Sequence, residues 1–246
     1  MRRTLVNVIN AVPGGDRLLD QYRRLRLSVR PDAKAHRGYV GGMWEEIGKV
    51  QIDFMVGQGL QPDDVFVDVA CGSLRAGRHF ISYLNPNNYL GLDHNRWLIE
   101  AGLKHEIPKQ VRKEKGPEFV VSNTFEFDKF TKRPRLGLAQ SLFSHLTPDD
   151  IHVCLANLKE AMQPGGRFFA TFIRKGNRAA AFADRGILMH DYENPAGSAD
   201  DLAFEYDAED LLKIGREIGW QARYIGDWGH PRGQEMLEFA LPEAEV

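Results

Sequence analysis

Apolar and polar positions follow two kinds of pattern along this chain. Short apolar runs rich in β-branched and aromatic residues predict five buried strands, over residues 65–69, 89–92, 119–122, 136–141 and 167–173. Apolar residues at helical spacing predict helices over residues 17–27, 43–56 and 74–84, and further helices that begin after Thr147 and Asp207. Strands that alternate with helices in this way are typical of an α/β fold with a parallel sheet.

The end of the chain and one central segment depart from this alternation. Residues 220–225 and 235–241 are two apolar runs separated by a polar turn, which predicts a closing hairpin. With the five earlier strands it makes a seven-stranded, mostly parallel sheet with helices on both faces. Residues 104–115 are rich in lysine and have no clear apolar period, so we expect a loop or a frayed helix there.

Local signals refine the helix after the fourth strand. Thr147 is a favourable N-cap residue, Pro148 fits the first turn, and Asp150 completes a capping box. Cys154 falls on the apolar face of this helix, so we expect it in the core. It and Cys71 are the two cysteines of the chain, which gives no disulfide framework and fits a reducing compartment.

Length and charge narrow the class of protein. A chain of 246 residues suits one α/β domain with a sizeable core and some added elements. A net charge of −2 supplies no excess positive field, so we expect no nucleic-acid partner. No apolar run approaches the roughly 20 residues that cross a bilayer. We therefore expect a cytoplasmic protein with no membrane partner.

The stretch over residues 65–80 joins a buried strand, a turn of small residues and a helix. A nucleotide binds naturally at such a place, outside the carboxyl end of the strand and near the helix N-terminus. A dinucleotide fold requires G-x-G-x-x-G, whereas this turn has Ala70, Gly72 and Gly77 with Leu74 and Arg75 between them. The glycine spacing therefore disfavours a nicotinamide oxidoreductase.

Five stretches carry a more specific pattern: DVACGSLRAGRHF (68–80), YLGLDHN (89–95), AQSLFSHLTPDDI (139–151), QPGGRFFATF (163–172) and DWGHPRGQEML (227–237). Together they resemble class I S-adenosylmethionine (SAM)-dependent methyltransferases, in particular a bacterial subgroup that includes enzymes acting on sugars and other hydroxyl compounds. Ala70 stands where the family has its first turn glycine. The resemblance runs from about residue 41 to 241 and implies a Rossmann-like methyltransferase fold.

The resemblance also implies a division of this single domain. Residues 1–60 would form an N-terminal helical cap, 61–173 the cofactor-binding core, 174–205 a substrate lid after the fifth strand, and 206–246 a C-terminal helix and hairpin. The turn at Gly41 and Gly42 would lie over the cofactor. For Trp44 two positions stay open: beside this turn, over the cofactor, or in the hydrophobic core. A long irregular segment such as 174–205 is often a lid or a binding loop.

Residues that follow the first four strands would bind SAM. They are Asp68, Ala70, Gly72, Arg75, Asp93, His94, Asn123, Thr124, Phe125 and Gln140. Asp93 lies about 25 residues after Asp68, close to the spacing of an acid that binds ribose hydroxyls at the end of a neighbouring parallel strand. A helix cap is the alternative role for Asp93. Asn123 stands where many family members have an acid beside the adenine.

Methyl transfer to a hydroxyl needs a base, and histidine is the usual choice near neutral pH. We expect His145 in this role, His230 as the second candidate and His190 as the third. The resemblance and the polar lid favour a sugar or short saccharide as acceptor, with His190, Tyr192, Tyr206 and Trp228 as substrate residues. No metal site is assigned, because His190–Asp191 and Asp200–Asp201 show no diagnostic spacing; Mg²⁺ dependence is an open alternative.

The predicted function is thus transfer of a methyl group from SAM to a hydroxyl of a small polar acceptor. Three alternatives stay open: an RNA methyltransferase, a protein methyltransferase and a SAM-binding module without catalysis. The near-neutral charge counts against RNA. Ala70 and Asn123, which depart from the family pattern, keep the non-catalytic module open. The sequence also leaves a homo-oligomer open.

Overall fold

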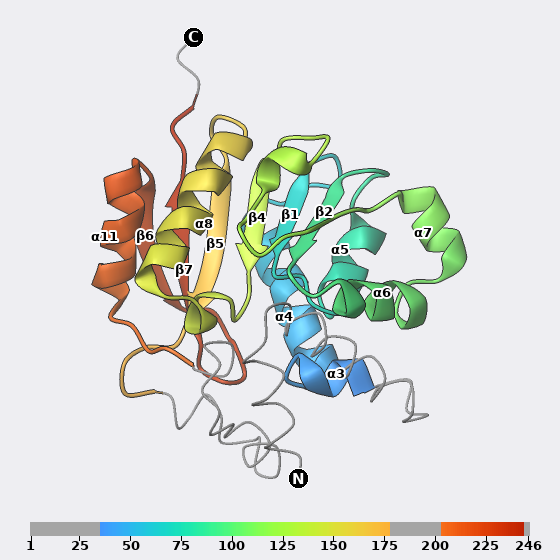
Figure 1. Ribbon diagram of the computed structural model, residues 1–246, viewed down its shortest axis with the longest axis horizontal. Coiled ribbons are helices and arrows are strands. Elements are labelled where there is room, and N and C mark those ends of the chain that lie inside the picture. The colour runs from blue at the N-terminus through green and yellow to red at the C-terminus, as the bar shows by residue number, and fades with distance from the viewer. Residues whose placement is uncertain (1–34, 178–202, 244–246) are drawn as a thin grey trace, which may run out of the picture.

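A computed structural model describes residues 35–177 and 203–243 (Figure 1). The strands are β1 (Phe66–Val69), β2 (Tyr89–Asp93), β3 (Glu118–Val121), β4 (Leu136–Ala139), β5 (Arg167–Phe172), β6 (Gln221–Asp227) and β7 (Glu235–Ala240). The α-helices are α3 (Ala35–Tyr39), α4 (Trp44–Gly57), α5 (Gly77–Tyr83), α6 (Arg96–His105), α7 (Lys109–Lys115), α8 (Pro148–Ala161) and α11 (Ala208–Ile218), with 3₁₀ turns η1 (Phe127–Lys129) and η2 (Phe143–His145). The predicted helix over 17–27, His190, Tyr192 and most of segment 174–205 lie outside the described residues.

The seven strands form one sheet in the order β3-β2-β1-β4-β5-β7-β6. β1 to β5 are parallel, and β7 pairs antiparallel with both β5 and β6. The expected fold is confirmed: a Rossmann-like methyltransferase fold with a mostly parallel sheet and an antiparallel hairpin. β1 lies between β2 and β4, so the strand order reverses beside it. Ligands of doubly wound folds bind at such a switch point, outside the carboxyl ends of the strands.

Each face of the sheet is covered by helices. α8 and α11 pack on one face, where Cys154, Leu155, Leu158 and Leu211 join the apolar side chains of the strands. In Figure 1 these two helices lie in front of the sheet. α4 and α5 cover the other face with residues such as Met55 and Phe80, and Ile99 of α6 joins the same cluster. Cys154 is fully buried, as expected, and the predicted capping box of Thr147 and Asp150 is present.

Several element ends differ from the sequence prediction. The helix expected from residue 74 begins at Gly77, because residues 70–76 form a turn in which Leu74 has a left-handed backbone. Segment 104–115 contains the end of α6 and a separate helix, α7, which buries no residue and therefore shows no apolar period. Asp207 precedes α11 as expected, but its side chain makes no capping hydrogen bond. Trp44 is buried among other side chains, in agreement with its core alternative.

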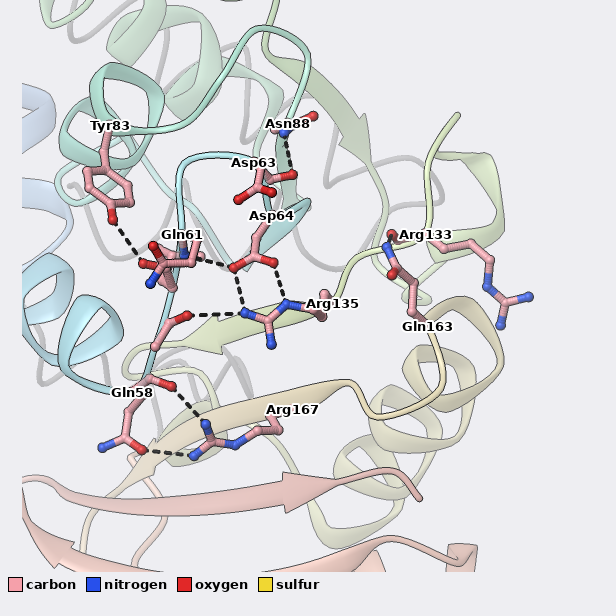
Figure 2. A network of polar contacts seen from close by, with 12 residues as sticks. Gln58, Gln61, Asp63, Asp64, Tyr83, Asn88, Arg133, Arg135, Gln163 and Arg167 are labelled. Atoms are coloured by element: carbon pink, nitrogen blue, oxygen red, sulfur yellow. Dashed lines mark hydrogen bonds and ion pairs between the residues drawn. The ribbon is translucent and has the colours of Figure 1, made fainter. Parts of the chain in front are cut away.

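The amino edge of the sheet is fastened by arginines (Figure 2). Arg135, at the start of β4, pairs with Asp64 and donates to the carbonyl of Gly59 at 3.2 Å. Arg167, at the start of β5, donates to the Gln58 carbonyl at 2.8 Å and to Gln58 Oε1 at 2.9 Å. These charge-assisted hydrogen bonds satisfy backbone carbonyls of the loop between α4 and β1. The loop is fixed on the side of the sheet opposite the predicted site.

Candidate functional site

The carboxyl edge of the sheet, which is the lower edge in Figure 1, carries an unusual turn after β1. Ala70, Gly72 and Leu74 have φ angles of 60°, 54° and 66°, so three alternate residues adopt the left-handed conformation. Each L-residue in this region costs roughly 1–2 kcal/mol, and glycine alone enters it freely. The turn therefore keeps a backbone suited to three glycines although two of the positions have side chains. Strain of this kind concentrates at functional sites.

Packing explains why Leu74 occupies such a position. Its side chain is fully buried, between α5 and α6. A Cβ on Gly77 would lie 2.9 Å from Leu74 Cδ2, and a Cβ on Gly102 would lie 2.8 Å from Leu74 Cγ. The two glycines thus leave room for the leucine. Burial of a leucine side chain stabilises by about 1.5–3 kcal/mol, which offsets the strain in its backbone.

Asp93 joins the end of β2 to this turn. Its Oδ2 accepts the backbone N–H of Gly72 at 2.8 Å, and its Oδ1 accepts that of Asn95 at 2.7 Å. The second bond lies at the start of α6, so the capping alternative of the sequence analysis is present in part. Burial raises the pKa of Asp93. The nearby His94 and the two amide donors lower it, but burial has the larger effect. Each carboxylate oxygen has a second lone pair, so Asp93 retains acceptor capacity toward a hydroxyl.

A second buried acid, Asp68, lies one strand away. It accepts a hydrogen bond from the Tyr89 hydroxyl at 2.8 Å. Burial raises the pKa of Asp68 to about 7; the Tyr89 bond lowers it, and the nearby Asp93 carboxylate raises it further. Cys71 lies between these acids in sequence and is buried too, which raises the pKa of its thiol well above the usual range. Cys71 is therefore an unreactive packing residue.

Arg75 fastens the turn to two other parts of the chain. Its Nη1 donates to the carbonyls of Val40 at 3.1 Å and Gly42 at 3.0 Å, and its Nη2 donates to Gln140 Oε1 after β4. Both terminal nitrogens of the guanidinium thus have protein partners. The expected contact of Arg75 with the cofactor stays a prediction; its hydrogen bonds join the turn to residues 40–42 and to Gln140.

Gln140 belongs to a polar network that crosses the ends of β4, β5 and the β6–β7 turn. Its Nε2 lies 2.6 Å from Ser141 Oγ, 3.1 Å from Gln234 Oε1 and 3.2 Å from His230 Nε2. Thr171 accepts the Ser141 amide at 2.7 Å and donates to Gln234 Oε1 at 2.8 Å. These bonds hold Ser141, whose φ is 62°, in another left-handed conformation.

The two expected catalytic histidines have different surroundings. His230 is buried; its Nδ1 accepts the Arg232 backbone amide at 3.2 Å, and its Nε2 lies 3.2 Å from Gln140 Nε2. Both ring nitrogens of His230 therefore already face protein groups. His145 lies in η2, directly after β4, with an exposed side chain.

Both described ends of segment 174–205 meet beside η2. The amide of Phe204 donates to the Ser144 carbonyl at 2.7 Å, next to His145. The Tyr206 amide donates to the Ile173 carbonyl at 2.9 Å, and the Tyr206 hydroxyl donates to the Leu146 carbonyl. The segment therefore leaves and rejoins the fold at the carboxyl end of β5.

The remaining expected site residues fall into two groups. His94, Asn123 and Thr124 are exposed beyond β2 and β3, whereas Phe125 is buried and stacks on Phe127. Trp228 is half-buried; its indole N–H donates to the Gln234 carbonyl at 2.9 Å, and its ring centroid lies 5.4 Å from that of His230. The structure thus brings Trp228, His230, Gln140 and Arg75 together, while Asn123 and Thr124 lie at the far end of the edge.

Three residues of this site were missed by the sequence analysis: Thr171, Arg232 and Gln234. Thr171 does give a signal, because it is a polar residue inside the apolar run 168–173. Gln234 and Arg232 give none, since their roles depend on which strand ends meet.

Within residues 35–177 and 203–243 no cluster of three or more His, Cys, Asp or Glu side chains could hold a metal ion. Nor does any helix of these ranges have the length and apolar character that crossing a membrane requires.

Comparison with known proteins supports the fold assignment. No family model matches the chain. A magnesium protoporphyrin IX methyltransferase from Synechocystis PCC 6803, solved with bound SAM, is 12% identical with a TM-score of 0.55, over 79% of this chain and 80% of that one. An O-methyltransferase family protein from Burkholderia thailandensis is 12% identical with a TM-score of 0.58, over 87% and 62%. The glycopeptide N-methyltransferase MtfA, complexed with SAM, is 13% identical with a TM-score of 0.56, over 80% and 94%.

Proposed function

We propose that this protein binds SAM at the carboxyl edge of β1 and β2 and transfers its methyl group to a hydroxyl of a small polar acceptor. The observation that carries the proposal is the left-handed turn at residues 70, 72 and 74, which is hydrogen-bonded to the Asp93 carboxylate at the end of the next parallel strand. That turn and that acid lie where doubly wound folds bind nucleotides. Similar folds solved with SAM support the same ligand.

The residues at this edge fit the cofactor. Gly72 has a left-handed backbone in the turn, and its amide is held by the Asp93 carboxylate. Asp93 would accept hydrogen bonds from the ribose hydroxyls with the lone pairs that the two amides leave free. Asn123 and Thr124, exposed after β3, would face the adenine end. SAM supplies an electrophilic methyl group, so the chain's own tasks are to align the acceptor, exclude water and remove a proton.

His145 is the base in this proposal. It follows β4, the strand beside β1, its imidazole is exposed, and the carbonyl of the preceding residue, Ser144, accepts the Phe204 amide. A base within hydrogen-bond reach of an acceptor hydroxyl contributes about 10²–10⁴-fold to the rate. His230, buried against Gln140, would instead position the polar network on the acceptor side.

A small hydroxyl compound fits the described surface better than a macromolecule. Among the described residues, Arg75 is engaged by two carbonyls and Gln140, and the buried acids Asp68 and Asp93 lie close by. Trp228 and Tyr206 are half-buried aromatic residues, and Ser141, also half-buried, carries a hydroxyl. Aromatic rings and hydroxyl groups suit a saccharide, which we propose as the acceptor class.

Calorimetric titration with SAM, S-adenosylhomocysteine and NAD tests the cofactor. We expect micromolar binding of the first two and none of NAD. Once binding is established, methyl transfer from labelled SAM to a panel of saccharides, with and without Mg²⁺, tests the reaction. Failure of both sulfur compounds to bind would overturn the proposed function. Binding with no transfer to any saccharide, protein or RNA would point to a SAM-binding module.

Exchange of single histidines tests the base. His145→Ala should lower the rate of methyl transfer about 10²–10⁴-fold and leave SAM affinity unchanged, because the base acts on the acceptor. His152→Ala, an exposed histidine on α8, is the matched control and should have no effect. If His145→Ala remains fully active while His230→Ala loses activity without losing SAM affinity or stability, the assignment passes to His230.

A further inference from the structure

Residues 40–43, which we call the strap, connect α3 to α4 and cross the turn after β1. Three successive carbonyls of the strap are bound by two arginines. Arg75 donates to the Val40 and Gly42 carbonyls at 3.1 and 3.0 Å, and Arg232 Nη2 donates to the Gly41 carbonyl at 2.6 Å. The arginines come from two segments far apart in the sequence, the turn after β1 and the β6–β7 turn. They hold the strap from two sides.

The strap covers the glycine at the centre of the proposed cofactor turn. A Cβ on Gly72 would lie 3.0 Å from Cγ1 of Val40, so the valine side chain lies directly against Gly72. The neighbouring Ser73 hydroxyl donates to the His36 carbonyl at 3.3 Å. The end of α3 and the strap together therefore shield the backbone of the turn on one side.

One residue of the strap, Met43, has a strained backbone. Gly41, Gly42 and Met43 have φ angles of 91°, 67° and 41°, three successive left-handed residues. Met43 also occupies the N-cap position of α4 and makes no side-chain capping bond. A strained backbone persists only where surrounding contacts impose it. The guanidinium bonds of Arg75 and Arg232 hold the three residues that directly precede Met43.

The elements on either side of the strap are fixed by other contacts. In α3, Arg37 Nε and Nη2 each donate to Glu106 at the end of α6 at 2.7 Å, and His36 contacts the same carboxylate at 2.7 Å. In α4, Glu45 pairs with Arg78 of α5. The strap is joined to α3 through its own backbone: the Gly41 amide donates to the Gly38 carbonyl at 3.1 Å and the Gly42 amide to the Arg37 carbonyl at 2.9 Å.

We propose that Arg75 and Arg232 are positioning residues that close the strap over bound SAM, and that release of their carbonyl bonds lets SAM leave. The inference rests on the proposed function and adds to it which residues set the residence time of the cofactor. Arg75 also orients Gln140, and Gln140 contacts His230. The closed strap is thereby linked through one guanidinium to the acceptor side of the site.

Two glycine variants test the strap with matched backbone strain. Gly42 and Gly59 both have positive φ angles, of 67° and 94°, and a Cβ at either would meet no atom within 4 Å. Alanine therefore adds strain without a clash at both positions. Gly59 lies in the α4–β1 loop at the amino edge, away from the site. We expect Gly42→Ala to release SAM about fivefold faster in stopped-flow displacement and Gly59→Ala to release it at the wild-type rate.

A third variant changes one of the two arginines that bind the strap carbonyls. Arg232→Lys keeps the charge but cannot present the guanidinium fork, and should also speed SAM release several-fold while the melting temperature stays near that of Gly59→Ala. Equal release rates for Gly42→Ala, Gly59→Ala and wild type would overturn the strap proposal, as would slower release from Gly42→Ala. Either result requires that wild type binds SAM. A wild-type protein that binds no SAM overturns the proposed function instead.

Discussion

Two buried carboxyl groups at the site, those of Asp93 and Asp68, differ in the hydrogen-bond donors that face them. Asp93 accepts two backbone amides, which stabilise its charge, whereas Asp68 has one hydroxyl donor, from Tyr89. A buried carboxylate with few donors is costly, and its pKa rises until the neutral form becomes accessible. The pKa of about 7 for Asp68 therefore predicts a pH effect on stability.

The direction of this effect follows from proton linkage. Between pH 3.8 and 7 the native state binds the Asp68 proton and the unfolded state does not, so the free energy of unfolding falls as pH rises through this window. Asp68→Asn removes the ionisation and keeps an acceptor for Tyr89. At pH 8 we expect the variant to be more stable than wild type, on the order of 2–4 kcal/mol, and at pH 4 the difference should vanish.

Urea denaturation at several pH values measures this difference directly. Asp64→Asn is a suitable control, because Asp64 pairs with Arg135 at the amino edge, where the ion pair lowers its pKa despite partial burial. The Asp64 variant should be less stable than wild type at neutral pH. An Asp68→Asn protein whose stability relative to wild type is the same at pH 4 and pH 8 would show that Asp68 is ionised throughout the range.

Single residues of the site could be predicted only where a local signal exists. Asp93 was predicted from its spacing after Asp68, and the structure places it against the turn as expected. The role of Arg75 could not be predicted, because its partners are backbone carbonyls, which every residue has. The same holds for Arg232 and Gln234, which join the site only after β6 and β7 pair beside β5.

Elements were easier to predict than single contacts. β1 to β5 begin and end within two residues of their predicted bounds, because a buried strand is a short apolar run between turn residues. The start of α5 was wrong by three residues, since apolar spacing cannot report that Leu74 is in a left-handed turn. α7 was unclear in the sequence because it buries nothing. The turn at Gly41 and Gly42, which is part of the strap, was expected to lie over the cofactor; that placement stays a prediction.

The turn after β1 gives a prediction at the scale of an element. Ala70→Gly removes the strain of a left-handed alanine, roughly 1–2 kcal/mol, but frees the unfolded chain, which costs about 0.4–1 kcal/mol. We expect a free energy of unfolding that is up to about 1 kcal/mol higher than in wild type, with SAM affinity unchanged. Thermal denaturation and calorimetry measure both quantities.

Asn87→Gly is the matched control for that exchange. Asn87 has a φ of 63° at the amino edge, just before β2, so it shares the backbone conformation without being near the site. Its exchange should also leave SAM affinity unchanged. A tenfold gain in affinity for Ala70→Gly alone would contradict the prediction, because it would mean that the alanine methyl group obstructs the cofactor.

At the scale of the whole molecule, the two edges of the sheet have different tasks. The amino edge is fastened by ion pairs and carbonyl bonds such as those of Arg135 and Arg167. The carboxyl edge holds most of the left-handed non-glycine residues: Met43, Ala70, Leu74, Phe125 and Ser141. Arginine contacts that fasten a connecting loop thus lie at one edge, and backbone strain lies mostly at the other, where the two ends of segment 174–205 also meet.

That meeting point predicts that segment 178–202 can be replaced without loss of the fold. The Lys175 amide donates to the Tyr206 carbonyl at 3.1 Å and the Tyr206 amide to the Ile173 carbonyl at 2.9 Å, so the remaining ends are already held together. A short glycine–serine linker in place of residues 178–202 should preserve the melting temperature and SAM affinity and abolish transfer to the acceptor. Circular dichroism, calorimetry and a methyl-transfer assay distinguish these outcomes. Loss of SAM affinity with acceptor turnover retained would show that the segment serves the cofactor. Removal of a substrate lid should instead reduce acceptor turnover while SAM affinity is retained.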